Sequence, residues 1–127
     1  MISLQLMVPL SNLELITALD SSKEIEITVT GRKSGRKISL PVWFVHEGEK
    51  LLLLPLKGTT TNWYRNILRT PATGVSARGV KVSGKAKPVT DPSKVKEVVE
   101  KFRERYSSGE VGRYYSNFDA CVELNLD

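Results

Sequence analysis

Residues 24–45 read EIEITVTGRKSGRKISLPVWFV, and this stretch decides the fold. From Glu24 to Thr30, apolar residues alternate with polar ones, which is the period-two pattern of a half-buried β-strand. A second alternation runs from Ile38 to Val45, but both of its faces are apolar, which indicates a central strand. The glycine-bracketed turn Gly31–Arg36 joins the two segments. We therefore expect two consecutive strands connected by this turn in a β-rich domain.

The remaining sequence adds four expected strands and two or three helices. Leu51–Leu56 is a continuous apolar strand, in which Pro55 implies an edge, a bulge or an end. Asp91-Pro92 is a cap-and-proline helix start, and an apolar face at spacings of three and four follows as far as Tyr106. The other expected segments are a short helix from the capping box of residues 11–14 to about residue 20, a helix over 63–69, strands over 73–78, 80–89 and 120–126, and a polar connection over 107–117.

Together these segments predict an α+β fold that is mainly antiparallel β. Six strands form one sheet that curls towards a barrel, and two or three helices plug or flank it. The length of 127 residues suits a single domain, 1–127, with residues 1–22 as an N-terminal extension that carries a short helix.

Composition limits the classes of function. One cysteine and one histidine allow neither an internal disulfide nor a zinc cluster, so we expect no metal site. The N-terminus lacks the cationic segment of a signal peptide, and no apolar run approaches the ~20 residues of a membrane span, so we expect a soluble cytoplasmic protein. A formal charge of +5 favours an anionic partner, which is a nucleic acid, a membrane or a phosphorylated small molecule.

The turn Gly31–Lys37 concentrates four cations and a hydroxyl between two strands. Its glycines permit positive φ angles, which let backbone amides converge on one anion. Arg32 and Arg36 add bidentate phosphate contacts, and Lys33 adds a point charge. The alternative is a hairpin turn kept soluble by its charges. Local physics leaves both interpretations open.

A second segment, Lys57–Asn66, leads from a strand through three threonines into a predicted helix N-terminus. Free amides and the positive end of the helix dipole make this a second candidate anion site. The alternative is an ordinary loop and cap, with Trp63 and Tyr64 in the core. Asn66 fits that alternative poorly, because a buried amide needs hydrogen-bond partners.

Taken together, these two segments resemble the deazaflavin-dependent nitroreductase and quinone reductase family, within the split β-barrel group that also contains flavin-binding pyridoxamine-phosphate oxidases. The resemblance runs from about Glu24 to the C-terminus. It rests on Thr30-Gly31-Arg32-Lys33-Ser34-Gly35-Arg36, on Pro41-Val42, on Lys57-Gly58, and on Trp63-Tyr64 with Asn66 and Pro71.

The resemblance implies a six-stranded split β-barrel that binds coenzyme F-420, an 8-hydroxy-5-deazaflavin, with FMN as the alternative. It also implies a homodimer. The cationic turn would face the phosphate and acidic tail, Pro41 and Val42 would line the ring, and Tyr114 and Tyr115 would contact the acceptor substrate. The cofactor-binding residues so implied are Gly31, Arg32, Lys33, Ser34, Gly35, Arg36, Pro41, Val42, Lys57, Gly58, Trp63 and Asn66.

The functional hypothesis is therefore an oxidoreductase that passes hydride from F-420 to a small electron-poor acceptor such as a quinone, a nitro compound or an activated alkene. No catalytic side chain is expected, because a deazaflavin carries the hydride itself. One alternative is a basic β-barrel without enzymatic activity that binds single-stranded nucleic acid, with Trp43, Trp63 or Tyr64 as stacking platforms. Another is a cofactor carrier that does not turn over.

Overall fold

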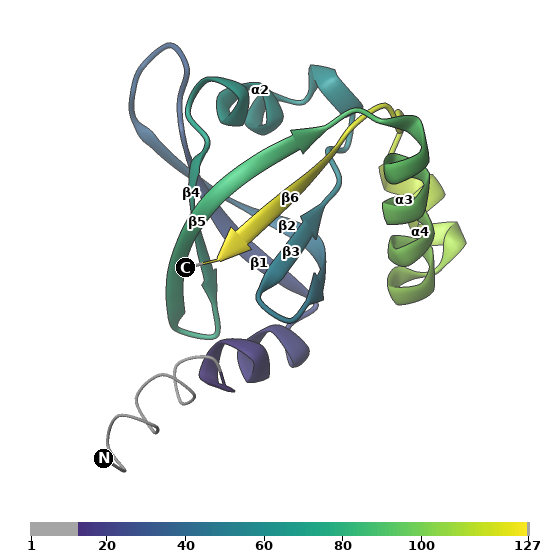
Figure 1. Cartoon of the computed structure of the whole chain (residues 1–127), viewed down its shortest axis with the longest axis horizontal. Coiled ribbons are helices and arrows are strands. Elements are labelled where there is room, and N and C mark those ends of the chain that lie inside the picture. Colours follow the sequence, from purple (N-terminus) through teal and green to yellow (C-terminus); the bar gives the residue numbers. More distant parts are fainter. Residues whose placement is uncertain (1–12, 127) are drawn as a thin grey trace.

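The computed structural model describes residues 13–126 (Figure 1). Residues 13–20 form a helix that precedes the first strand. The other elements, in chain order, are β1 (Glu24–Thr30), β2 (Lys37–Glu47), β3 (Lys50–Leu53), the 3-10 turn η1 (Gly58–Thr60), α2 (Asn62–Arg69), β4 (Ala72–Ala77), β5 (Val80–Val89), α3 (Pro92–Tyr106), α4 (Ser108–Tyr114) and β6 (Cys121–Leu126).

The six strands close into a barrel in the order β1-β2-β3-β6-β5-β4, and every pairing is antiparallel. This confirms the predicted α+β barrel. The first three strands form a meander, and a two-residue turn joins β4 to β5. Arg78 and Gly79 of that turn both have positive φ, at 48° and 83°. Positive φ at both central residues is what a tight hairpin turn requires, because it matches the twist of the two strands.

Two predictions about individual segments need correction. The apolar run over residues 51–56 pairs as a strand only to Leu53, and the chain leaves the sheet before Pro55. The predicted polar connection over 107–117 is wrong, because it contains the helix α4. The Ser107 side chain accepts a hydrogen bond from the Glu110 N–H, 3.3 Å away, and Val111 is buried. Ser107 and Glu110 have capping-box spacing, so a signal for this helix was present in the sequence.

The barrel interior is closed by one helix at each end, as Figure 1 shows. Leu15, Ala18 and Leu19 from the helix of residues 13–20 are buried in the barrel core. From α2, at the other end, the buried residues in the same core are Trp63, Tyr64 and Ile67. The start of the predicted capping box, at residues 11 and 12, lies outside the described residues.

Polar contacts fix the helix of residues 13–20 against the barrel. His46 Nε2 lies 2.8 Å from Asp20 Oδ1. Just beyond the helix, the carbonyl of Ser21 accepts from Arg78 Nη2 at 2.9 Å, and the carbonyl of Ser22 accepts from Arg105 Nη2 at 2.6 Å. Cations at a helix C-terminus are favourable because the free carbonyls carry partial negative charge.

A second core lies outside the barrel, where α3 and α4 cover β3 and β6 (Figure 1). Val98 and Phe102 of α3 are fully buried there, with Leu52 and Cys121 from the strands. The predicted apolar face of α3 is therefore confirmed. The Asp91 side chain accepts from the Ser93 N–H at 3.2 Å, as its predicted role as a cap requires. Within residues 13–126, no helix has the length and apolar character needed to cross a bilayer.

The hydroxyl of Tyr106, at the end of α3, connects the two cores. It accepts a hydrogen bond from the Phe44 N–H at 3.0 Å, and its single proton is shared between the carbonyl oxygens of Lys23 and Phe44, at 2.7 and 2.9 Å. The pairing of β1 with β2 stops at this point, with Glu24 opposite Trp43. A side-chain hydroxyl thus replaces the next rung of the ladder.

Replacing Tyr106 by phenylalanine should lower the free energy of unfolding by about 1–3 kcal/mol, because it leaves buried main-chain groups of Phe44 without a partner. Urea denaturation followed by circular dichroism measures the change. Tyr114→Phe is the matched control, because Tyr114 is 52% exposed and should shift stability by less than about 0.5 kcal/mol. Equal effects of the two substitutions would contradict the role of the Tyr106 hydroxyl.

Candidate active site

A pocket of about 410 Å³ opens beside β2, between that strand, α4 and the start of α2. Its walls are mostly apolar, as is typical of a site for a planar organic ligand. Four segments distant in the sequence supply its lining, which comprises Glu24, Leu40, Pro41, Val42, Trp43, Leu54, Leu56, Thr61, Trp63, Tyr114 and Tyr115.

Over residues 37–43, the edge of β2 that borders this pocket pairs with no other strand of the described chain, residues 13–126. β2 pairs with β1 through these residues on its other edge, and with β3 only over residues 44–47. The main-chain groups of Phe44 point to the β1 side, where they bond the Tyr106 hydroxyl. Successive residues of a strand direct their main-chain groups to opposite edges. The N–H and C=O of Trp43 and the C=O of Pro41 therefore lie on the open edge.

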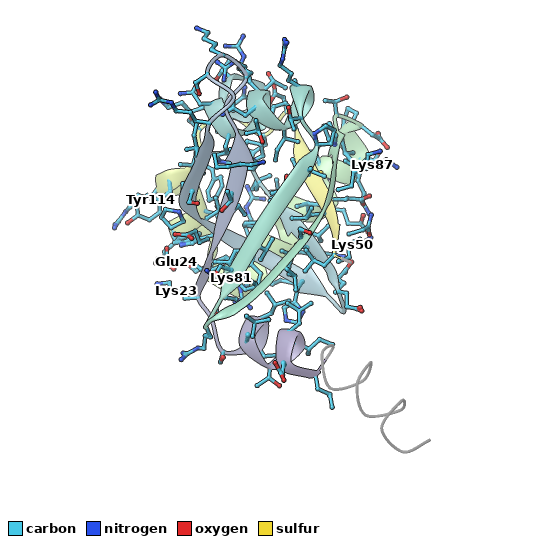
Figure 2. All side chains as sticks on the ribbon, turned by 90° about the vertical axis from the view of Figure 1, so that its left-hand side faces the viewer. Lys23, Glu24, Lys50, Lys81, Lys87 and Tyr114 are labelled. Carbon is cyan, nitrogen blue, oxygen red and sulfur yellow. The ribbon has the colours of Figure 1, made fainter. Side chains whose placement is uncertain are left out.

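Aromatic side chains line the α4 side of the pocket. The indole of Trp43 stacks on Tyr106, with ring centroids 4.3 Å apart, and it meets Tyr114 edge-on at 5.5 Å. Figure 2 shows Tyr114 projecting from the surface. Tyr115 is buried, and its hydroxyl makes no hydrogen bond within residues 13–126. Burial, with a smaller contribution from Tyr106, raises the pKa of the Tyr115 phenol well above its ordinary value, so the phenol stays a neutral donor.

The cationic turn over residues 31–36 is held by its own hydrogen bonds. The Gly31 N–H donates to the Arg36 carbonyl at 2.8 Å, and the Gly35 N–H donates to the Gly31 carbonyl at 2.9 Å. The Arg36 N–H donates to Ser34 Oγ at 3.1 Å. Gly35 has φ +73°, as expected, whereas Gly31 does not have a positive φ; a Cβ at Gly31 would meet Ser34 Oγ at 2.8 Å, so the serine side chain would have to shift. These amides are already bonded, so the expected convergence of the turn's amides on an anion is wrong for them.

Asn66 of α2 anchors the turn. Its Oδ1 accepts from the Arg32 N–H at 3.0 Å and from Arg32 Nη1 at 2.8 Å. Arg32 also reaches the carbonyl of Asn62, 3.4 Å away. Asn66 is only 5% exposed, so these bonds supply the partners that a buried amide requires. Arg32 and Asn66 thus form a structural joint between the turn and α2.

The other cations of the turn are free to bind a ligand. The side chains of Lys33 and Arg36 are exposed, and neither makes a hydrogen bond or ion pair within residues 13–126. Lys37 Nζ donates to Thr30 Oγ1 at 3.0 Å. The described part of the turn therefore offers two cations without partners to an anion.

The loop that contains Lys57 and Gly58 is fastened to the segment after α4. Asp119 accepts from the Thr59 N–H at 2.9 Å and from Thr59 Oγ1 at 2.8 Å. Desolvation acts to raise the pKa of Asp119, but hydrogen bonds from Thr59, from its own main chain and from Asn117 together hold this pKa below its ordinary value. The contact therefore contributes stability at neutral pH, and this contribution is lost as the pH falls through the folded-state pKa of Asp119. Gly58 is buried against Asp119 and Asn117.

The N-terminus of α2 faces the same region. The first bonded amide is that of Arg65, which donates to the Thr61 carbonyl at 3.1 Å, so the amides of residues 62–64 have no acceptor within the helix. Thr61 does not cap them, because its hydroxyl accepts from the Lys57 N–H at 2.8 Å. Thr61 and Trp63 both line the pocket. The free helix end thus lies between the pocket and the cationic turn.

The description of the family whose model matches residues 7–121 is F420H(2)-dependent quinone reductase. The chain belongs to this family. It is therefore a member of an oxidoreductase family that uses reduced coenzyme F-420. No curated protein sequence matches the chain.

Solved structures share the fold of this quinone reductase family member at low sequence identity. An F420-H2 dependent reductase, FDR-A, is 20% identical, with a TM-score of 0.64 over 81% of this chain and 94% of that one. The heme storage protein HutZ from Vibrio cholerae is 16% identical, with a TM-score of 0.69 over 90% and 88%. A candidate pyridoxamine 5'-phosphate oxidase from Listeria innocua is 14% identical, with a TM-score of 0.67 over 91% and 93%.

In this family member, the residues predicted for the site fall into two groups. Pro41, Val42, Trp63, Tyr114 and Tyr115 line one pocket. The second group lies outside the pocket wall and consists of the cationic turn Gly31, Arg32, Lys33, Ser34, Gly35 and Arg36 with Lys57, Gly58 and Asn66. Within it, the contacts of Arg32, Gly58 and Asn66 are architectural.

Two residues of the pocket wall, Trp43 and Glu24, were not predicted as site residues from the sequence. Trp43 was expected to be buried in the core, but it is only half-buried and its ring lines the pocket. Glu24 read as the polar position of an alternating strand. The predicted pairing of the two strands was the available signal for both residues. In the structure, the register of that pairing places Glu24 opposite Trp43 on the outer face of the barrel.

Replacing Gly58 by alanine should destabilise this reductase by about 1–3 kcal/mol. Gly58 has φ +59°, and a Cβ would overlap the Asp119 carboxylate that bonds Thr59. Thermal unfolding monitored by circular dichroism measures the loss. Gly109→Ala in α4 is the control, because nothing lies within 4 Å of its Cβ position and alanine favours a helix. A Gly58→Ala protein as stable as Gly109→Ala would contradict the proposed packing.

Proposed function

We propose that this protein binds coenzyme F-420 between the cationic turn and the pocket beside β2, and reduces a small electron-poor acceptor there. A quinone is the first candidate, and nitro compounds and activated alkenes are the others. The observation that carries the proposal is an apolar, aromatic-lined pocket whose wall includes the start of α2, the helix to which Arg32 and Asn66 fasten the cationic turn. We call the pocket and this turn together the groove, which suits a ligand that joins an anionic tail to a planar ring.

The residues beside β2 fit a deazaflavin ring. Its imide edge has an N–H between two carbonyls, and the open edge of β2 offers the Pro41 carbonyl and the Trp43 N–H as complementary partners. Val42 and Trp63 supply apolar surface to the ring. Bound there, reduced coenzyme F-420 supplies the hydride, while the protein orients the reactants and excludes water.

The exposed cations would hold the tail. Lys33 and Arg36 have no partners in the described chain, and the free amides of residues 62–64 at the start of α2 add partial positive charge. Arg32 contributes indirectly, because its bonds to Asn66 hold the turn against α2.

The double substitution Lys33→Ala/Arg36→Ala should raise the Kd for F-420 by at least about tenfold, because it removes two charge-assisted contacts. Fluorescence titration of the purified protein with F-420, and separately with FMN, measures the affinities. The matched control is Lys81→Ala/Lys96→Ala, which removes two exposed lysines from β5 and α3 and should leave the Kd within about twofold.

The titration has two results that count against the proposal. Failure of the wild-type protein to bind F-420 below about 100 μM would remove the proposed function, because even modest anchoring supplies about 5 kcal/mol. Tighter binding of FMN than of F-420 would replace the deazaflavin by a flavin.

The acceptor would lie on the α4 side of the pocket. Trp43 and Tyr114 present aromatic surface, and the neutral Tyr115 phenol is a hydrogen-bond donor for a carbonyl or nitro oxygen. A donor at the oxygen stabilises the negative charge that develops there as the acceptor is reduced.

Tyr115→Phe should therefore lower kcat/KM for a quinone by about tenfold and leave the Kd for F-420 unchanged. Steady-state oxidation of reduced F-420, followed by absorbance, measures the rate. Tyr114→Phe should have a smaller effect, because the exposed Tyr114 hydroxyl remains solvated. An unchanged rate in both variants would place the acceptor elsewhere.

The alternative of single-stranded nucleic acid binding loses its stacking platforms in this structure. Trp63 and Tyr64 are 6% and 2% exposed, and Trp43 is stacked on Tyr106. The expected homodimer has a parallel in one solved structure, described as a domain-swapped dimer and 20% identical to this chain. That description concerns the other protein, and self-association of this chain remains an expectation.

A further inference from the structure

Among residues 13–126, Glu24 is the one acidic side chain that lines the pocket, and the other described lining residues are apolar or uncharged. It begins β1, directly opposite Trp43, so the two side chains lie next to each other on the outer face of the barrel. Glu24 forms no ion pair within residues 13–126. Figure 2 shows Glu24 and Tyr114 on the same side of the molecule, with Lys23 close to Glu24.

The position of this carboxylate gives the groove a charge gradient. Lys33 and Arg36 lie in the turn that precedes β2, whereas Glu24 pairs with Trp43 near the middle of that strand. Lys23, the nearest cation in sequence, is directed over the Trp43 ring, with its Nζ 5.8 Å from the ring centroid. Glu24 makes no ion pair with Lys23 within residues 13–126, so an acceptor stacked near Trp43 and Tyr114 meets an unpaired carboxylate at the pocket mouth, beside the Lys23 ammonium over the indole.

We propose that Glu24 is a specificity-determining residue that makes the pocket select neutral or cationic acceptors over anionic ones. This inference rests on the proposed function. The carboxylate repels an anionic substituent on the acceptor, and it keeps the anionic tail of the cofactor at the opposite, cationic end of the groove. A charge at the pocket mouth acts on kcat/KM because it changes the affinity for each acceptor without taking part in hydride transfer.

The test compares three quinones under saturating reduced F-420: naphthoquinone, its sulfonated derivative, and a derivative that carries a trimethylammonium group. The intrinsic reactivities of the quinones differ, so the quantity compared is each quinone's kcat/KM relative to naphthoquinone, in each variant. Glu24→Gln should raise the relative value for the sulfonate by about fivefold and lower that for the ammonium compound by a similar factor. Glu24→Lys should extend both changes in the same direction.

Glu26→Gln is the matched control. Glu26 is exposed on the same face of the same strand, two residues further along, but it does not line the pocket. It should leave the relative values within about twofold. Raising the ionic strength should reduce the wild-type discrimination and have little effect on Glu24→Gln.

The outcomes separate this inference from the proposed function. If F-420 binds and naphthoquinone is reduced, but Glu24→Gln leaves the discrimination unchanged, Glu24 is not a specificity determinant and the proposed function stands. Equal effects of Glu24→Gln and Glu26→Gln also overturn the inference, because they would reflect the overall charge of β1. If the wild-type protein binds no F-420, the proposed function and this inference fall together.

Discussion

The rest of the structure depends on how β2 changes partner at Phe44. β2 has 11 residues, pairing with β1 up to Trp43 and with β3 from Phe44 onwards. The pairing with β1 ends at Trp43, so the main-chain groups of Phe44 that face β1 have no partner in the ladder. The Tyr106 hydroxyl contacts them, and it also contacts the carbonyl of Lys23. This contact satisfies the edge of β2 that faces β1, beyond the last pair with β1, while the opposite edge pairs with no described strand over residues 37–43, and the pocket forms along that opposite edge. The same contact joins the barrel to α3, so the wall that carries Tyr114 and Tyr115 is held at a fixed distance from β2.

Two polar joints set the other borders of the groove. Asn66 holds the cationic turn against α2 through Arg32, and Asp119 holds the loop before α2 through Thr59. The first joint uses two residues from the motifs that carry the family resemblance, Arg32 and Asn66. Motif residues are thus not all ligand contacts, because a binding site also needs side chains that hold its loops in place. Arg32 is the cation of this turn that is partly desolvated, because it packs against Asn66, while Lys33 and Arg36 stay exposed to water.

Much of the fold could be read from residue patterns, because the strands alternate and the long helix has a clear cap and apolar face. The barrel, the meander and the burial of the apolar face of α3 followed from those patterns. The helix α4 did not, because its seven residues include two glycines and its stability comes from packing, chiefly of Val111. For the site, periodicity identified Pro41 and Val42 only as strand residues, and their place at the pocket depends on which edge of β2 lacks a partner. That property emerges only when β3 ends early and Trp43 meets Glu24 across the ladder, both of which are consequences of tertiary pairing.

The placement of the charges explains how a protein with a net charge of +5 can contain a pocket with mostly apolar walls. Hydride chemistry is favoured where water is excluded and where no unpaired charge has to be desolvated. Apart from Glu24, the described residues of the pocket wall have aliphatic, aromatic or hydroxyl side chains, and burial keeps the Tyr115 phenol neutral. Under the proposed function, the cations that would bind an anionic tail, Lys33 and Arg36, lie on a turn where their side chains are exposed to water. A cation moved towards the centre would have to lose that solvation, at a cost that could exceed what its contact with the ligand returns. The separation of charged and apolar regions is therefore a requirement of the chemistry, and the open edge of β2 is the feature that makes room for it.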